Sequence, residues 1–164
     1  MEHFLEKISS YNIFNYLLPG VLFVAICKHF GLFDLNQEDL LLNLFLYYFM
    51  GLIISRFGSL IIEPILKRIG FVKFAPYGDF IKACSIDDKI DTLSEVNNTY
   101  RSLLALSICI PIAAGYDKLI SKYALLDDLQ LYFWSVLLIL LFLFSYRKQT
   151  SYITSRVKKT LSRI

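Results

Sequence analysis

Four long apolar runs, separated by polar blocks, dominate the chain. They extend over residues 13–30, 40–62, 103–120 and 129–146. A bilayer core about 30 Å thick needs roughly 20 residues of helix, because each residue rises about 1.5 Å. Four strands are too few for a closed barrel, and open strands leave backbone groups unpaired in hydrocarbon. The pattern therefore predicts an all-α, polytopic membrane protein with four transmembrane helices.

Composition supports a membrane protein and argues against a metal or cofactor site. Hydrophobic side chains make up 56% of the 164 residues and aromatic side chains 16%, more apolar surface than a soluble domain of this length can bury. The three cysteines have no C-x-x-C spacing, and the two histidines are isolated. We therefore expect no metal site and no cofactor.

Basic residues are distributed unequally about the four runs. Because basic loops resist translocation, the side that carries more of them is expected to be cytoplasmic. One side carries only Lys28, Lys118 and Lys122. The other carries thirteen, namely Lys7, Lys67, Arg68, Lys73, Lys82, Lys89, Arg101, Arg147, Lys148, Arg156, Lys158, Lys159 and Arg163. Both termini and the segment 64–101 are thus predicted to face the cytoplasm.

The cytoplasmic segment 64–101 divides into two parts. The first part is interrupted by prolines and glycines, and its Lys67 and Arg68 are expected to contact anionic lipid headgroups. The second part is predicted to be an amphipathic helix with an N-cap at Ser85. Its polar face is either a docking surface for a soluble partner or an ordinary solvated face. That face comprises Asp91, Glu95, Asn98 and Arg101.

The tail, residues 147–164, carries a second amphipathic pattern. Ile153, Val157, Leu161 and Ile164 recur at helical spacing, and basic residues occupy the other faces. A basic amphipathic helix on the inner leaflet is the simplest prediction, with a helix contact in an oligomer or an acidic partner as alternatives. Direct binding of nucleic acid is not expected, because membrane orientation already explains these charges. The lipid-facing basic residues of the tail are Arg156, Lys158 and Lys159.

Small residues form stripes on the second and third runs. Residues spaced by four along a helix share a face, so these stripes allow two backbones to approach closely. We expect the second and third helices to form an inner seam and the fourth to face lipid. The seam lies either within one subunit or between subunits, and a homo-oligomer such as a tetramer is expected, because four short helices enclose no aqueous path. The stripes are Gly51, Ser55 and Ser59, and Ala105, Cys109 and Ala113.

Four polar side chains lie inside or at the mouth of the apolar runs. Arg56 and Glu63 are two helical turns apart on nearly the same face, so either an ion bridge between helices or a cytoplasmic vestibule could hold them. Arg56 is close enough to the cytoplasmic end to snorkel to headgroups, with a conducting or sensing role as the alternative. Asn12 and Asn15 are predicted to cap the first helix, with a bond to a neighbouring helix as the alternative. Pro19 and Gly20 are expected to give the same helix a static bend, with a hinge for gating as the alternative.

The segments EKISSYNIFNYLLPGVLF and NNTYRS, together with the four-run plan, resemble small membrane proteins of bacterial anti-phage defence operons. The chain resembles the KwaA family, the membrane component of Kiwa systems. The resemblance implies an oligomeric protein of the bacterial inner membrane that senses infection. It also implies a soluble cytoplasmic partner, the DNA-binding KwaB.

No enzymatic motif accompanies these features, because the chain has no nucleophile with a base, no phosphate-binding glycine loop and no H-E-x-x-H. We therefore expect a non-enzymatic sensor or scaffold that recruits or regulates a cytoplasmic partner. The alternatives are an oligomeric pore-forming effector and a subunit of a small transporter.

Overall fold

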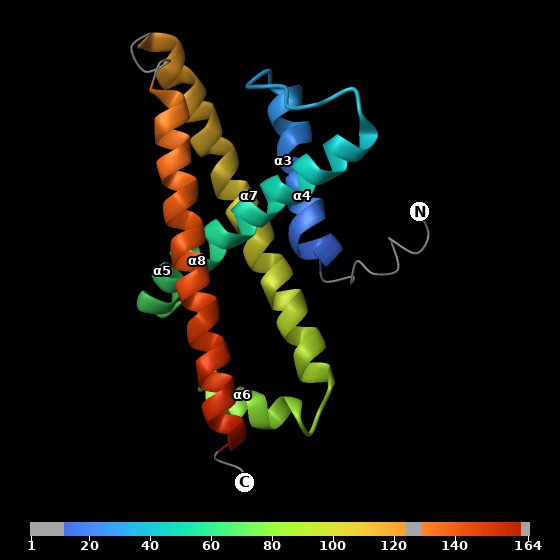
Figure 1. The fold of residues 1–164 in the computed structure, drawn as a ribbon, viewed down its shortest axis with the longest axis vertical. Helices are drawn as coiled ribbons and strands as arrows, with labels where there is room; N and C mark the ends of the chain where they lie inside the picture. The colour runs from blue at the N-terminus through green and yellow to red at the C-terminus, as the bar shows by residue number, and fades with distance from the viewer. Residues whose placement is uncertain (1–11, 124–128, 162–164) are drawn as a thin grey trace.

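The structure, a computed structural model, describes residues 12–123 and 129–161, and every regular element within them is helical. The all-α class is therefore confirmed. Two elements, marked η, are single π-helical turns. In chain order the elements are η1 (Ile13–Leu17), α3 (Leu18–His29), α4 (Leu40–Phe57), η2 (Gly58–Ile62), α5 (Glu63–Arg68), α6 (Tyr77–Cys84), α7 (Lys89–Lys122) and α8 (Gln130–Leu161) (Figure 1).

Within the described residues, three helices are long and apolar enough to cross a membrane. They are Leu40–Arg68, which joins α4, η2 and α5, together with Lys89–Lys122 and Gln130–Leu161. The first predicted span is also helical, over Ile13–His29, but it is a shorter apolar helix. Membrane localisation is consistent with this set of helices.

Each π-helical turn ends two residues before a proline. The amide of Leu18 donates to the carbonyl of Ile13, and the amide of Glu63 donates to the carbonyl of Gly58, so both turns are closed by bonds across five residues. Pro19 and Pro64 follow, and neither has an amide hydrogen. The wider turn carries the chain past the proline ring while the helix continues, which makes both sites local departures from α geometry.

The first two apolar helices cross with their backbones in contact. A Cβ added at Gly20 would overlap the carbonyl of Tyr47, and one added at Gly51 would overlap the carbonyl of Tyr16. Only glycine permits this approach at either position. Figure 1 shows α4 running obliquely past η1 and α3 at this crossing.

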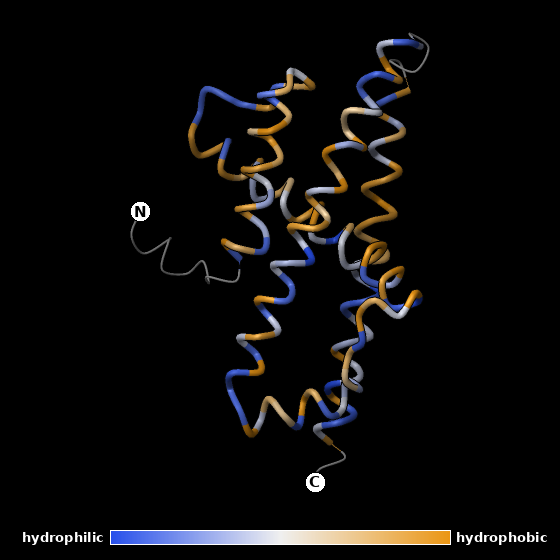
Figure 2. The backbone as a smooth tube through the Cα atoms, turned by 180° about the vertical axis from the view of Figure 1, so that it is seen from behind, coloured by the Kyte–Doolittle hydropathy of each residue, from blue (hydrophilic) through white to orange (hydrophobic). Residues whose placement is uncertain are grey.

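Helices α7 and α8 lie together near the end of α7, where Tyr116 contacts Phe133 and Trp134, and diverge toward α6 (Figure 1). Both helices are much longer than their apolar parts. At about 1.5 Å per residue, the 34 residues of α7 and the 32 of α8 extend roughly 50 Å each. Short α6 lies between the start of α7 and the end of α8 (Figure 1). In Figure 2 the hydrophilic positions become frequent along α7 as it approaches α6.

Two predictions about these helices need correction. Ser85 is not an N-cap: it lies at the C-terminal end of α6, where its hydroxyl donates to the carbonyl of Lys82, and the next helix begins at Lys89. The tail is not a separate helix, because α8 continues without a break from the fourth apolar run to Leu161. Arg163 and Ile164 lie outside the described residues, as does Lys7.

The buried core is small and lies where α3, α4, η2 and α7 meet. Its members are Phe23, Cys27, Ile54, Ile62, Ala105 and Leu106. Of the described residues in α8, only Ser145 is buried. The expectation that the fourth helix presents most of its surface outward agrees with this exposure.

Candidate functional site

Three neutral polar side chains meet inside the apolar bundle. The hydroxyl of Ser102, on α7, donates to the amide oxygen of Asn15 at 2.6 Å and lies 3.0 Å from the hydroxyl of Ser55 on α4. All three residues are at most 2% exposed. We call them the neutral network. Because the bonds join three helices, each polar group is satisfied where no water would be available.

The prediction that Asn12 and Asn15 cap the first helix was wrong. Asn12 lies at the N-terminal end of η1, yet its side chain makes no capping hydrogen bond. Asn15 instead bonds to a neighbouring helix, which was the alternative.

Glu63 forms the ion bridge between helices that we considered for Arg56 and Glu63, whereas Arg56 bonds to a neutral hydroxyl. Arg56 is half-buried and donates from its guanidinium to the hydroxyl of Tyr16 at 3.1 Å. Glu63 pairs with other helices. The two side chains thus serve different neighbours, because the π-helical turn between them changes the angular relation that an ideal helix would give.

Glu63 is the centre of an ionic cluster, which we define as Glu63, Lys67, Arg101 and Lys148. The carboxylate is 2.8 Å from the Lys67 ammonium, 2.6 Å from the Arg101 guanidinium and 3.5 Å from the Lys148 ammonium. Its side chain is only 7% exposed. A carboxylate this buried is stable only with such partners, and here they tie α5, α7 and α8 together at one level.

Proline explains why Lys148 belongs to this cluster. In the π-helical turn the carbonyl of Ser59 faces Pro64, which has no amide hydrogen to donate. The Lys148 ammonium donates to that carbonyl and to the Ser59 hydroxyl, both at 2.7 Å. The charge on α8 therefore satisfies a backbone acceptor that the helix itself leaves open.

The stripe of small residues on α4 and η2 does not form one seam with α7. Gly51 meets the backbone of η1 and α3, Ser55 bonds to α7, and Ser59 accepts from α8. The predicted inner seam between the second and third helices is thus only part of the packing. On the α7 stripe Ala105 is fully buried, and Cys109 and Ala113 lie partly buried against the core.

Two of the predicted lipid-facing residues have contacts within the chain. Lys67 is in the ionic cluster, and its ammonium lies 4.0 Å from the centre of the Phe74 ring. The Lys159 side chain lies against Gly78 of α6. The remaining three are exposed, namely Arg68, Arg156 and Lys158.

The predicted docking face on α7 loses one member. Asp91 and Glu95 are exposed and Asn98 is half-buried, as a docking or solvated face requires, but Arg101 is bound to Glu63. Beside this face, burial and then the neighbouring Asp91 carboxylate raise the pKa of the Cys84 thiol, so its thiolate is disfavoured.

Sequence reasoning missed Tyr16, Ser102 and Lys148 as site residues. Of the three, Ser102 could have been found from the sequence, because it is a polar residue directly before an apolar run. Asn15, which was found, is likewise a polar residue near the start of an apolar run. Lys148 was counted only as a positive charge that orients the membrane. Its link to Ser59 depends on the π-helical turn, for which no sequence signal other than Pro64 exists.

The polar side chains of the site link helices to one another. In the described part of the chain, no group of three or more His, Cys, Asp or Glu residues is placed to hold a metal ion. The polar groups described above bond to one another across helices, and their arrangement joins helices at a defined level. No family model, curated protein or solved structure matches the chain.

Proposed function

We propose that the chain is a non-enzymatic scaffold of the bacterial inner membrane that carries a helical platform on its cytoplasmic side. The platform comprises residues 77–101 and the end of α8 from residue 148 onward. The observation that carries this proposal is the length of α7 and α8, which exceeds what a bilayer needs, combined with the α6 bridge between them.

The lengths of α7 and α8 support a platform that projects several helical turns beyond the bilayer core. A bilayer core of about 30 Å takes roughly 20 residues of each helix, so some 12 to 14 residues of α7 and α8 project beyond it. Stacking of Tyr77 on Tyr152, with ring centres 5.7 Å apart, holds α6 against α8. The projecting part is thus braced rather than made of two separate helix ends.

The proposed topology has four crossings with both termini in the cytoplasm. The helix Ile13–His29 is the fourth crossing in addition to the three long helices. Support comes from the distribution of basic residues, which are abundant at the α6 end of the molecule and scarce in the loops at the opposite end. The ionic cluster then lies at the level of the inner headgroups.

The partner proposed for this platform is a soluble cytoplasmic protein, bound at the exposed acidic face of α7. The sequence resemblance to Kiwa membrane components supports anti-phage defence as the setting, a KwaB-like protein as the partner, and a homo-oligomer as the functional form. Sensing of infection would then act by changing how the platform holds its partner.

Site-specific crosslinking in the native cells tests the proposal. A photo-crosslinking amino acid at Glu95 should capture one soluble protein, whereas the same probe at Asp117, near the opposite end of α7, should not. The double charge reversal Asp91→Lys with Glu95→Lys should abolish co-purification of that protein in detergent while the mass of any oligomer stays unchanged.

Two results would overturn the scaffold proposal. One is equal capture of soluble protein at both positions, which would contradict a platform on one side. The other is a bare homo-oligomer that conducts ions in liposomes, which would favour the pore-forming alternative.

A further inference from the structure

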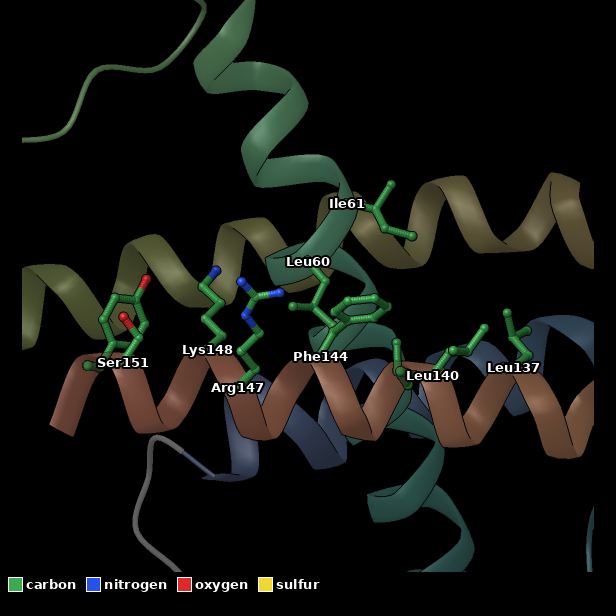
Figure 3. A pocket seen from close by; sticks show the side chains of 10 residues that line it. Leu60, Ile61, Leu137, Leu140, Phe144, Arg147, Lys148 and Ser151 are labelled. Carbon is green, nitrogen blue, oxygen red and sulfur yellow. The ribbon is translucent and has the colours of Figure 1, made fainter. Parts of the chain in front are cut away.

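An open groove of about 680 Å³ runs between η2 and α8. One part of it is apolar, with walls from Leu60 and Ile61 on η2 and from Leu137, Leu140 and Phe144 on α8. The other end is lined by Arg147 and Lys148. Figure 3 shows these two basic side chains beyond Phe144, on the same side of α8 as the apolar wall.

The length of the groove matches one leaflet of a bilayer. From Leu137 to Arg147 the helix rises about 15 Å, which is half of a core about 30 Å thick. An acyl chain that lay along the leucines would therefore bring its headgroup phosphate to the level of Arg147. The aliphatic end of the groove would lie near the bilayer centre.

Charge at the headgroup end favours an anion. The ionic cluster places three basic side chains around one carboxylate, which leaves excess positive charge beside the groove. Among the described residues Arg147 has no hydrogen-bond or ion-pair partner, and its guanidinium is exposed at the groove. A guanidinium can bind two oxygens of a phosphate at once, and the Ser151 hydroxyl lies at the same end.

We infer that the groove binds an anionic glycerophospholipid of the inner leaflet, with its phosphate at Arg147 and an acyl chain against Leu137, Leu140 and Phe144. This site goes beyond the scaffold function and depends only on α8 crossing the bilayer. A bound lipid would cover the side of η2 that faces α8, next to the contact between Ser59 and Lys148.

Native mass spectrometry of the full chain in detergent tests the headgroup end. Palmitoyl-oleoyl phosphatidylglycerol should bind more tightly than phosphatidylcholine with the same acyl chains. Arg147→Gln should reduce that preference about fivefold, the factor expected for one basic side chain near anionic headgroups. The control Lys158→Gln removes an exposed positive charge from the same helix outside the groove, and it should leave the preference unchanged.

A second pair of variants tests the apolar end without changing charge. Leu140→Trp should fill the groove and weaken binding of both lipids at least fivefold, whereas Leu143→Trp, at a position that does not line the groove, should have no effect. Equal affinity for the two lipids in the unmodified protein would overturn the proposal. So would equal losses for Arg147→Gln and Lys158→Gln, since these would indicate diffuse attraction to the basic tail. A second copy of the chain in the groove would appear as a lipid-free dimer that Leu140→Trp disrupts, and that result would also overturn it.

Discussion

The crossing of α3 with α4 and the attachment of α8 are two very different helix contacts in one small protein. At the crossing, the backbones touch at Gly20 and Gly51. By contrast, α8 reaches its neighbours through side-chain ends, such as Phe142 against Phe49 with ring centres 6.1 Å apart, and Lys148 against Ser59. The first contact depends on the fit of two backbones, and the second depends on the charged Lys148 side chain at one position along α8.

The difference follows from what can hold helices together in lipid. Acyl chains are as apolar as leucine, so burial of leucine against a neighbour gives no net driving force there. Close backbone packing and polar bonds remain, and the chain uses the first for α3 and α4 and the second for α8. We therefore expect α8 to be the most separable helix.

Replacement of Gly51 by alanine should have the largest effect. The new Cβ overlaps the backbone of Tyr16, which cannot rotate away, so the crossing must open at a cost of about 3 kcal/mol or more. Thermal unfolding in detergent should show a large loss of stability. Gly115→Ala is the matched control, because nothing lies within 4 Å of its added Cβ, and it should be neutral or more stable by up to about 1 kcal/mol. Similar melting of the two variants would contradict a contact fixed by shape.

Replacement of Glu63 by glutamine should have the next largest effect and should act on α8. Loss of the buried carboxylate leaves three basic side chains without their counter-charge, which costs about 3 kcal/mol. Limited proteolysis should then cut the tail faster than in the unmodified protein. Glu95→Gln, on the exposed face of α7, should leave both melting and proteolysis unchanged. An intact tail in Glu63→Gln would show that charge does not hold α8.

Replacement of Ser102 by alanine should have a moderate effect, because it removes two neutral bonds and leaves Asn15 and Ser55 without that partner. A loss of about 1 to 2 kcal/mol is expected. Ser107→Ala is the control, since its exposed hydroxyl bonds only to the Leu103 carbonyl of its own helix. Raised salt should leave the Ser102→Ala difference unaltered, and a strong salt dependence would be evidence against a neutral network.

The smallest effect is expected at Asp34, in the loop between α3 and α4. The backbone amide of Asn36 and the Lys28 ammonium lower the pKa of Asp34 below its ordinary value. Its charged form is therefore favoured in the folded state, so its contribution is present above the ordinary pKa and is lost as the pH falls through the lowered one. Asp34→Asn should melt slightly below the unmodified protein at about pH 6, and this difference should shrink as the pH falls below about 4, the ordinary pKa of an aspartate. A constant difference across that range would exclude this linkage.

The sequence was sufficient for the helices of the four apolar runs, but not for α6, which lies in a part of the chain that its prolines and glycines had marked as irregular, and not for the partners of the helices. Apolar runs identify helices because length and hydropathy are local properties, and small residues spaced by four correctly indicated close packing. The helix that each small residue contacts depends on the tertiary structure. Gly51, Ser55 and Ser59 each contact a different helix. The continuity of α8 could not be predicted from the local sequence either. No residue near the end of the apolar run at Tyr146 and Arg147 indicates whether the helix ends there or continues.

Charges were harder to interpret than apolar residues. Arg56 and Glu63 lie on nearly the same face only if the helix is ideal. Arg101 was grouped with Asp91, Glu95 and Asn98 on a docking or solvated face, but it bonds to Glu63. The spacing rules assume α geometry throughout, and the turn at Gly58–Ile62 breaks that assumption.

The two π-helical turns also have a consequence for comparing this chain with its relatives. Each holds one residue more than an α-helical turn, so it behaves as a single-residue insertion that the helix has absorbed. A relative one residue shorter between positions 58 and 62 would keep an unbroken helix but rotate the equivalent of Glu63 by about 100° away from its three cations. Length at this one place, rather than overall identity, would thus show whether a relative has inherited the same anchor for its last helix.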